Sequence, residues 1–153
     1  MEAGALGQFK DLGMAAAISL SALGSSLGVW PAGQAAVGAW KKCYVQNKMA
    51  PFLLVVFIGA PLSQTIYGMI LMNRIAQAAV QGHFLWGIGI FGGLAIGASA
   101  MGQGYIGASA ADALAETGKG FTNYLIALGI IETVAIFVLV FLLGQIDVIA
   151  SVK

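Results

Sequence analysis

The chain has 153 residues, of which 59% are hydrophobic and 8% charged, with a formal net charge of +1. Soluble domains carry charge on about 25% of their residues, so this chain lacks the charge to cover a water-facing surface. A soluble catalytic domain, a nucleotide-binding loop and a nucleic-acid partner are therefore not expected. The apolar residues form long runs, which predicts an all-α membrane protein with about four transmembrane helices.

The first expected span covers residues 12–40 and consists mainly of small side chains. Gly24 and Gly28 form a small-xxx-small pattern, which lets two membrane helices approach closely and gain packing energy. Pro31 is expected to kink this helix or to begin its next segment. The glycines of this span therefore indicate helix packing.

The loop at residues 41–51 contains three lysines, the only basic cluster of the chain. By the positive-inside rule this loop is cytoplasmic, and four spans then put both termini on the outer side. The loop at residues 116–121 contains Lys119 and falls on the same cytoplasmic side. Lys10 and Arg74 lie near the outer side and weaken this bias slightly.

The second expected span, residues 52–72, has polar side chains in its middle. Pro61 has no N–H for the carbonyl one turn before it, which leaves a backbone oxygen under-satisfied. Ser63 and Tyr67 share a helix face, with Gln64 at its edge. Such groups are costly at one depth of a membrane. They indicate either coordination of a ligand or a hydrogen-bonded seam between helices.

An outer loop is expected at residues 73–83, and a third span follows at residues 84–111. This span is again rich in glycine. Gln103 is its conspicuous polar residue, and Ser99 lies one turn before it on the same face. Asp112 is expected in the last turns, in contact with water.

The fourth expected span, residues 121–143, carries a single carboxylate, Glu132. At ~1.5 Å per residue this segment crosses a ~30 Å hydrocarbon core, which puts Glu132 near the middle of the bilayer. An ionised carboxylate there costs a few kcal/mol or more, and such residues usually belong to an ion or proton path. The alternative is a structural Glu that hydrogen-bonds to a neighbouring helix.

The two halves of the chain resemble each other, which indicates an internal duplication. Residues 20–33 align with residues 98–111, with Ser, Ala and Gly in the same order. Each half comprises a glycine-rich helix, a cytoplasmic loop and a bulkier helix, so the two hairpins have parallel orientation. We expect a first hairpin at residues 1–80 and a second hairpin, with the mid-span carboxylate, at residues 81–153.

These features resemble the proteolipid of V-type rotary ATPases, the four-helix K (c-type) subunit of the membrane rotor ring. The resemblance covers nearly the whole chain and looks closest to the sodium-translocating bacterial members. In those, a P-x-T-Q-x-x-Y-G motif in helix two, a Gln in helix three and a Glu in helix four form the ion site. Ser63 replaces the Thr and keeps a hydroxyl oxygen. The matching residues here are Pro61, Ser63, Gln64, Tyr67, Gly68, Gln103 and Glu132.

The resemblance implies an ion site for Na⁺, and the residue types agree with it. Sodium is a hard cation that favours several oxygen ligands. A proton site needs only one carboxyl group in an apolar pocket, so the larger set of oxygens favours Na⁺ over H⁺. Tyr67 would donate its O–H to Glu132 and fix the rotamer of the carboxylate. The implied ligands are Glu132, Gln64, Gln103, Ser63 and the backbone carbonyl of Ala60. No organic cofactor is implied.

The family also implies an assembly. Copies of the chain would form a ring in a prokaryotic cell membrane, with helices one and three inside and Glu132 at the outer rim. An ion-loaded site is neutral and can turn through lipid, whereas an empty site would pair with an Arg of a stator subunit. Central-stalk subunits would bind on the cytoplasmic side. The chain would not be an enzyme on its own, and its rotation would couple to ATP hydrolysis or synthesis elsewhere.

Two other classes of function remain open at this point. A small ion channel or secondary transporter would use Glu132 in a central pathway through one or two copies of the chain. A structural membrane assembly protein would use Glu132 only for hydrogen bonding, and replacement by Gln would leave ion transport unchanged.

Overall fold

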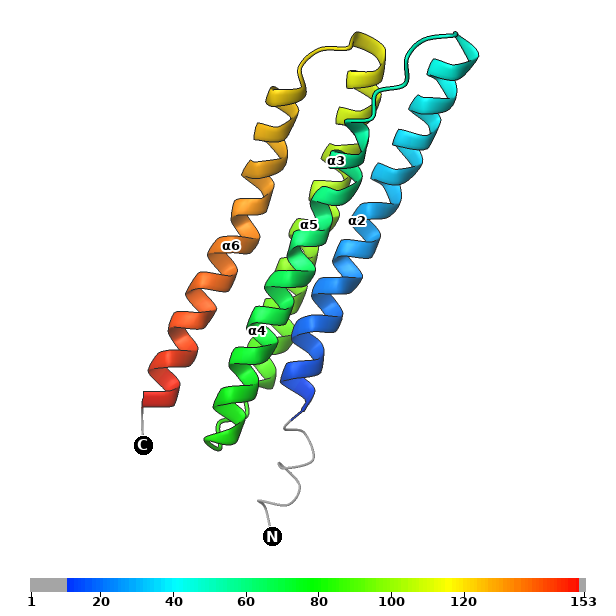
Figure 1. The fold of residues 1–153 in the computed structure, drawn as a ribbon. Coiled ribbons are helices and arrows are strands. Elements are labelled where there is room, and N and C mark those ends of the chain that lie inside the picture. Colours follow the sequence, from blue (N-terminus) through cyan, green and yellow to red (C-terminus); the bar gives the residue numbers. More distant parts are fainter. Residues whose placement is uncertain (1–10, 152–153) are drawn as a thin grey trace.

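The computed structural model describes residues 11–151, and this part of the chain is a bundle of long helices (Figure 1). The segments α3, η1 and α4 follow one another without a break and form one rod. The described chain thus contains four long rods, as the sequence predicts. The elements in chain order are α2 (Leu12–Val45), α3 (Leu54–Gly59), the 3₁₀ turn η1 (Ala60–Leu62), α4 (Ser63–Val80), α5 (Trp86–Thr117) and α6 (Phe121–Ser151).

Both hairpin loops lie at the same end of the bundle, the upper end in Figure 1. The α4–α5 connection and the described ends of the chain lie at the other end. At the hairpin-loop end, Lys42 on α2 and Glu116 on α5 form an ion pair of 3.5 Å. Gly118 ends α5 in the left-handed conformation, with φ of 65°, and its N–H donates to the carbonyl of Leu114.

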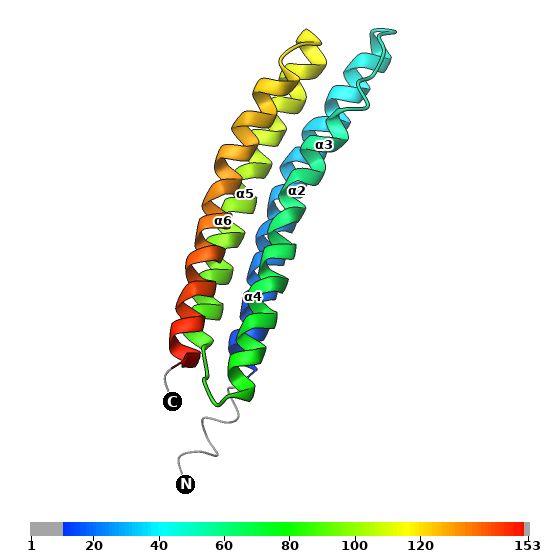
Figure 2. The same cartoon turned by 60° about the vertical axis from the view of Figure 1, so that its left-hand side comes forward.

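Three of the rods are long and apolar enough to cross a membrane by length and composition: α2, the α3–α4 rod and α6. The fourth rod, α5, has 32 residues but is not among these three. It lies alongside α2 in both views (Figures 1 and 2). A membrane that α2 crosses is therefore also crossed by α5, in agreement with the predicted four spans.

The packing of α2 on α5 depends on glycine. A side chain at Gly24 would overlap the backbone of Gly97, and one at Gly104 would overlap the backbone of Gly28. Lipid removes the hydrophobic driving force between helices, so close backbone contact supplies van der Waals energy instead. The structure confirms that the small-xxx-small pattern serves helix packing.

Several predicted boundaries are wrong. The helix α2 continues through Pro31, so the proline does not begin a new segment. The loop expected at residues 73–83 is helical as far as Val80, and the connection comprises residues 81–85. The helix α6 also continues beyond residue 143, to Ser151.

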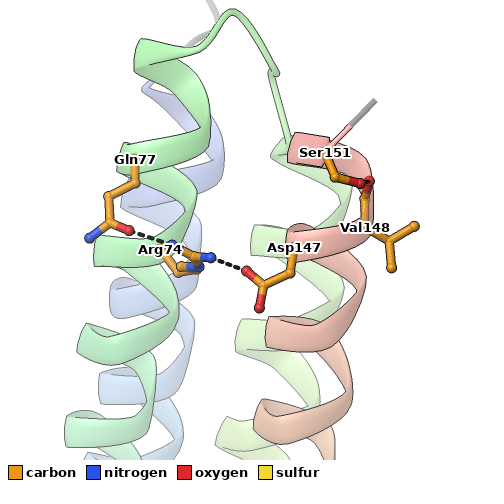
Figure 3. A network of polar contacts seen from close by, with 5 residues as sticks. All are labelled: Arg74, Gln77, Asp147, Val148 and Ser151. Carbon is orange, nitrogen blue, oxygen red and sulfur yellow. Dashed lines mark hydrogen bonds and ion pairs between the residues drawn. The ribbon is translucent and has the colours of Figure 1, made fainter. Parts of the chain in front are cut away.

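A polar contact joins the parts of α4 and α6 that extend beyond the predicted spans. Arg74 on α4 donates to Asp147 on α6 and to Gln77 one turn further along α4 (Figure 3). The two side chains are partly exposed, and each offsets the charge of the other. Lys10 and Lys153 lie outside the described residues.

The interior contains two apolar clusters with a polar layer between them. One cluster, toward the α4–α5 connection, includes Leu71 and Ile96. The other, toward the hairpin loops, includes Leu54, Phe57 and Leu114. The polar residues that the sequence analysis singled out lie between these clusters, on adjacent turns of α4, α5 and α6.

Candidate ion-binding site

The site begins at a local change of helix type. Pro61 cannot donate a backbone hydrogen bond, and the chain passes through the 3₁₀ turn Ala60–Leu62 before α4 begins. The carbonyl of Phe57 faces Gly107 on α5, where a Cβ atom would lie 2.8 Å from the oxygen. The glycine makes room for this freed carbonyl. The 3₁₀ turn brings polar side chains of early α4 toward α6.

The carboxylate of Glu132 on α6 accepts hydrogen bonds from two hydroxyl groups of α4. Ser63 Oγ lies 2.6 Å from Oε1 of Glu132, and Tyr67 Oη lies 2.8 Å from the same oxygen. Hydrogen bonds to a carboxylate are shorter and stronger than those between neutral groups. The sequence predicts this contact between Tyr67 and Glu132.

Gln103 on α5 connects the carboxylate to the interior. Its Nε2 lies 3.1 Å from the carbonyl of Leu128 and 3.4 Å from Oε2 of Glu132. Its Oε1 accepts from Nε2 of Gln64 at 3.0 Å. Gln64 is 0% exposed and Gln103 is 1% exposed, so each amide depends on protein partners. Every predicted side chain of the site thus lies in one connected network.

Several oxygen atoms gather around Ser63. Its Oγ lies 3.1 Å from the carbonyl oxygen of Ala60, 3.2 Å from Oε1 of Gln64 and 2.6 Å from Glu132. A serine hydroxyl has one hydrogen and donates to one acceptor at a time. The closest acceptor is the carboxylate. A backbone, an amide, a hydroxyl and a carboxylate oxygen therefore lie together, which is the ligand chemistry of a hard cation.

The described residues contain no group of three or more His, Cys, Asp or Glu side chains that could hold a metal ion. Thiolate and imidazole ligands favour zinc and other transition metals. The oxygens around Ser63 have a single carboxylate among them, Glu132. One formal negative charge matches a monovalent cation.

Ser99 also belongs to the site, although its role could not be predicted from the sequence. Its Oγ donates to the carbonyl of Ile131 at 2.7 Å, one residue before Glu132. The corresponding serine of the first half, Ser21, bonds within its own helix to the carbonyl of Ala17 at 2.8 Å. The sequence did place Ser99 on the helix face of Gln103. This shared face indicates that Ser99, like Gln103, points toward α6.

Glu132 lies at the surface side of the network. The carboxylate residue, Ser63 and Tyr67 are half-buried, whereas the two glutamines behind them are fully buried. The flanking residues Ile130 and Val134 on α6 are exposed. The site therefore opens on the outer face formed by α4 and α6, away from α2.

One segment of the chain is similar to a known protein family. Residues 86–143 match the family model of the ATP synthase C subunits. The matched segment comprises most of α5 and α6 and contains Ser99, Gln103 and Glu132. None of the curated proteins matches the chain. The match covers less than half of the chain and supports a likeness to the proteolipid subunits of ATP synthases and V-type ATPases.

Proposed function

We propose that this chain is a rotor-ring subunit of a V-type rotary ATPase or ATP synthase and carries Na⁺ across the membrane. The observation that supports it most is the oxygen cluster around Ser63 and Glu132. Na⁺ would lie among these oxygens, and the hydroxyl of Ser63 would keep its hydrogen but turn it away from Glu132. The proposed ligands are Glu132, Ser63, Gln64, Gln103 and the carbonyl of Ala60, and Tyr67 would hold the carboxylate.

The choice of ion follows from the number of polar groups. A proton carrier needs a carboxyl group and an apolar surrounding, and two buried glutamines add only desolvation cost to it. A sodium ion needs several oxygens to replace its water shell. Gln64 and Gln103 are the groups that a sodium site uses and a proton site does not. H⁺ is the alternative cargo.

The position of the site fits a ring. The helices α2 and α5 pack through small residues, which suits an inner layer of tight curvature, and α4 and α6 would form the outer layer. Glu132 then faces the rim, where a stator subunit can supply an Arg. A loaded site is neutral and can pass through lipid, whereas an empty carboxylate is costly there. Rotation of the ring would couple to a soluble head through central-stalk subunits at the cytoplasmic hairpin loops.

The channel or secondary-transporter alternative requires Glu132 in a central pathway of the four-helix unit. The half-buried carboxylate on the α4–α6 face favours a site between copies of the chain or at a stator. If the chain were a structural assembly protein, Glu132→Gln would leave ion transport unchanged. The rotor proposal predicts that this variant abolishes transport.

Carbodiimide labelling of the purified membrane protein tests the proposal. The reagent reacts with a protonated carboxyl group in apolar surroundings, so Glu132 is the expected target and Glu132→Gln is the control. At constant pH, millimolar Na⁺ should slow the reaction, and K⁺ at the same ionic strength should not.

Labelling of Glu132 that Na⁺ leaves unchanged would make the chain a proton carrier and would overturn the ligand assignment. If Glu132 is not labelled at all, the proposal that it forms an ion site is wrong.

A further inference from the structure

Ser25 on α2 has a hydroxyl group that finds no partner. It is 2% exposed, and within the described residues its Oγ is the one buried side-chain oxygen or nitrogen without a hydrogen bond. An unsatisfied buried hydroxyl costs about 1–3 kcal/mol, so it requires an explanation. An alanine would fill the same space in this helix without that cost.

The register of α2 against the α3–α4 rod places Ser25 beside the ion site. A Cβ atom at Gly68 would lie 2.6 Å from the Ser21 hydroxyl, so these two residues face each other. Further along α2, a Cβ atom at Gly28 would lie 3.0 Å from Cβ of Pro61. The two rods are antiparallel (Figure 1), so the residues between these contacts also face each other. They are Ser25 on α2 and Gln64 on the other rod.

The side-chain amide of Gln64 has one hydrogen to spare. Its Nε2 carries two hydrogens, and one of them is donated to Oε1 of Gln103. The amide of Gln103 points its Nε2, and not its oxygen, at the carbonyl of Leu128 and at Glu132. The oxygen of Gln64 already lies 3.2 Å from Oγ of Ser63, among the oxygens of the site. If both amide oxygens are to face a cation, Gln103 has to turn and no longer accepts from Gln64. Nε2 of Gln64 then needs a new acceptor on the side of α2.

We propose that Ser25 is a positioning residue whose hydroxyl accepts an N–H of Gln64 when the site holds Na⁺. The inference rests on the proposed sodium function and extends it. With Na⁺ bound, the amide oxygens of Gln64 and Gln103 would both face the ion, and Ser25 would replace Gln103 as the acceptor for Gln64. Protonation of Glu132 needs no turn of Gln103, so Ser25 would favour Na⁺ over H⁺.

The test compares Na⁺ protection of Glu132 from carbodiimide in the full chain and in Ser25→Ala. The expected result is an approximately fivefold rise in the Na⁺ concentration for half-protection, as for the loss of one neutral hydrogen bond. The labelling rate without Na⁺ should stay unchanged. The matched control is Ser21→Ala, because that serine is equally buried but bonds within its own helix. Ser25→Gly removes the same hydroxyl in a glycine-rich helix and should repeat the shift.

A second comparison links the effect to Gln64. In a Gln64→Leu background, the change Ser25→Ala should no longer alter half-protection, since the amide that it serves is absent. Equal half-protection in Ser25→Ala and the unchanged chain would overturn the role of Ser25 while leaving the sodium function intact. If Ser25→Ala changes the labelling rate by the same factor with and without Na⁺, Ser25 has only a structural role. Lack of Na⁺ protection in the unchanged chain would overturn both proposals.

Discussion

Ser99 on α5 donates its hydroxyl hydrogen to the carbonyl of Ile131, the residue directly before Glu132, at 2.7 Å. Gln103, one turn along α5, donates to the carbonyl of Leu128 at 3.1 Å. Two side chains of α5 thus hold successive turns of the α6 backbone on which the carboxylate is mounted. The carboxylate itself accepts hydrogen bonds from hydroxyl groups of α4. Its position therefore depends on both α4 and α5.

The change Ser99→Ala should loosen α6 at the carboxylate. We expect a loss of about 0.5–1.5 kcal/mol in the free energy of unfolding, the usual net contribution of one hydrogen bond. Half-protection of Glu132 by Na⁺ should need about two to five times more Na⁺. Thermal unfolding in detergent and the labelling assay measure the two effects. Ser109→Ala, whose hydroxyl bonds within α5 at an exposed position, should change neither.

The change Tyr67→Phe removes one donor to Glu132 and keeps the aromatic ring. A hydrogen bond to a charged group contributes about 1.5–3 kcal/mol, so the Na⁺ concentration for half-protection should rise about tenfold or more. Tyr105→Phe is the control, because that side chain is exposed on α5. A Tyr67→Phe protein with unchanged Na⁺ protection would show that Ser63 alone orients the carboxylate.

The residues of the site could be predicted from local signals in the sequence. Three features are unusual in a lipid-facing helix. They are the proline without an N–H, the polar groups one turn apart and the isolated carboxylate. Ser63, Gln64, Tyr67, Gln103 and Glu132 were therefore conspicuous before any fold was known. The packing of α2 on α5 was predictable for the same reason, because a run of small residues allows one kind of membrane contact.

Features that depend on pairs of distant residues could not be predicted in this way. The predicted second span ends too early, because a charge such as that of Arg74 indicates the end of an apolar segment. Its partner Asp147 lies far away in the sequence. Ser21 and Ser99 occupy equivalent places in the duplication, yet only Ser99 bonds to another helix. The register that brings Ser25 to Gln64 is likewise a property of the assembled bundle.

The glycines of the α2–α5 contact should tolerate no side chain. Gly104→Ala would place a methyl group on the backbone of Gly28, so we expect a loss of at least about 1–3 kcal/mol or failure to assemble. Gly38→Ala is the matched change in α2, where an added methyl group meets nothing within 4 Å. It should stabilise the helix by about 0.5–1 kcal/mol. The yield of folded protein in detergent and its thermal midpoint measure both; equal behaviour would contradict the close backbone contact.

The ion pair between Arg74 and Asp147 should contribute little to stability despite joining two outer helices (Figure 3). Exposed pairs usually contribute about 0–1 kcal/mol, because water and salt screen them and ordering long side chains costs entropy. Arg74→Gln should therefore lower the free energy of unfolding by no more than about 1 kcal/mol. The double exchange Arg74→Asp with Asp147→Arg should restore most of the loss, and high salt should reduce the difference between variants. A loss well above this range that salt leaves unchanged would mean that lipid, and not water, surrounds the pair.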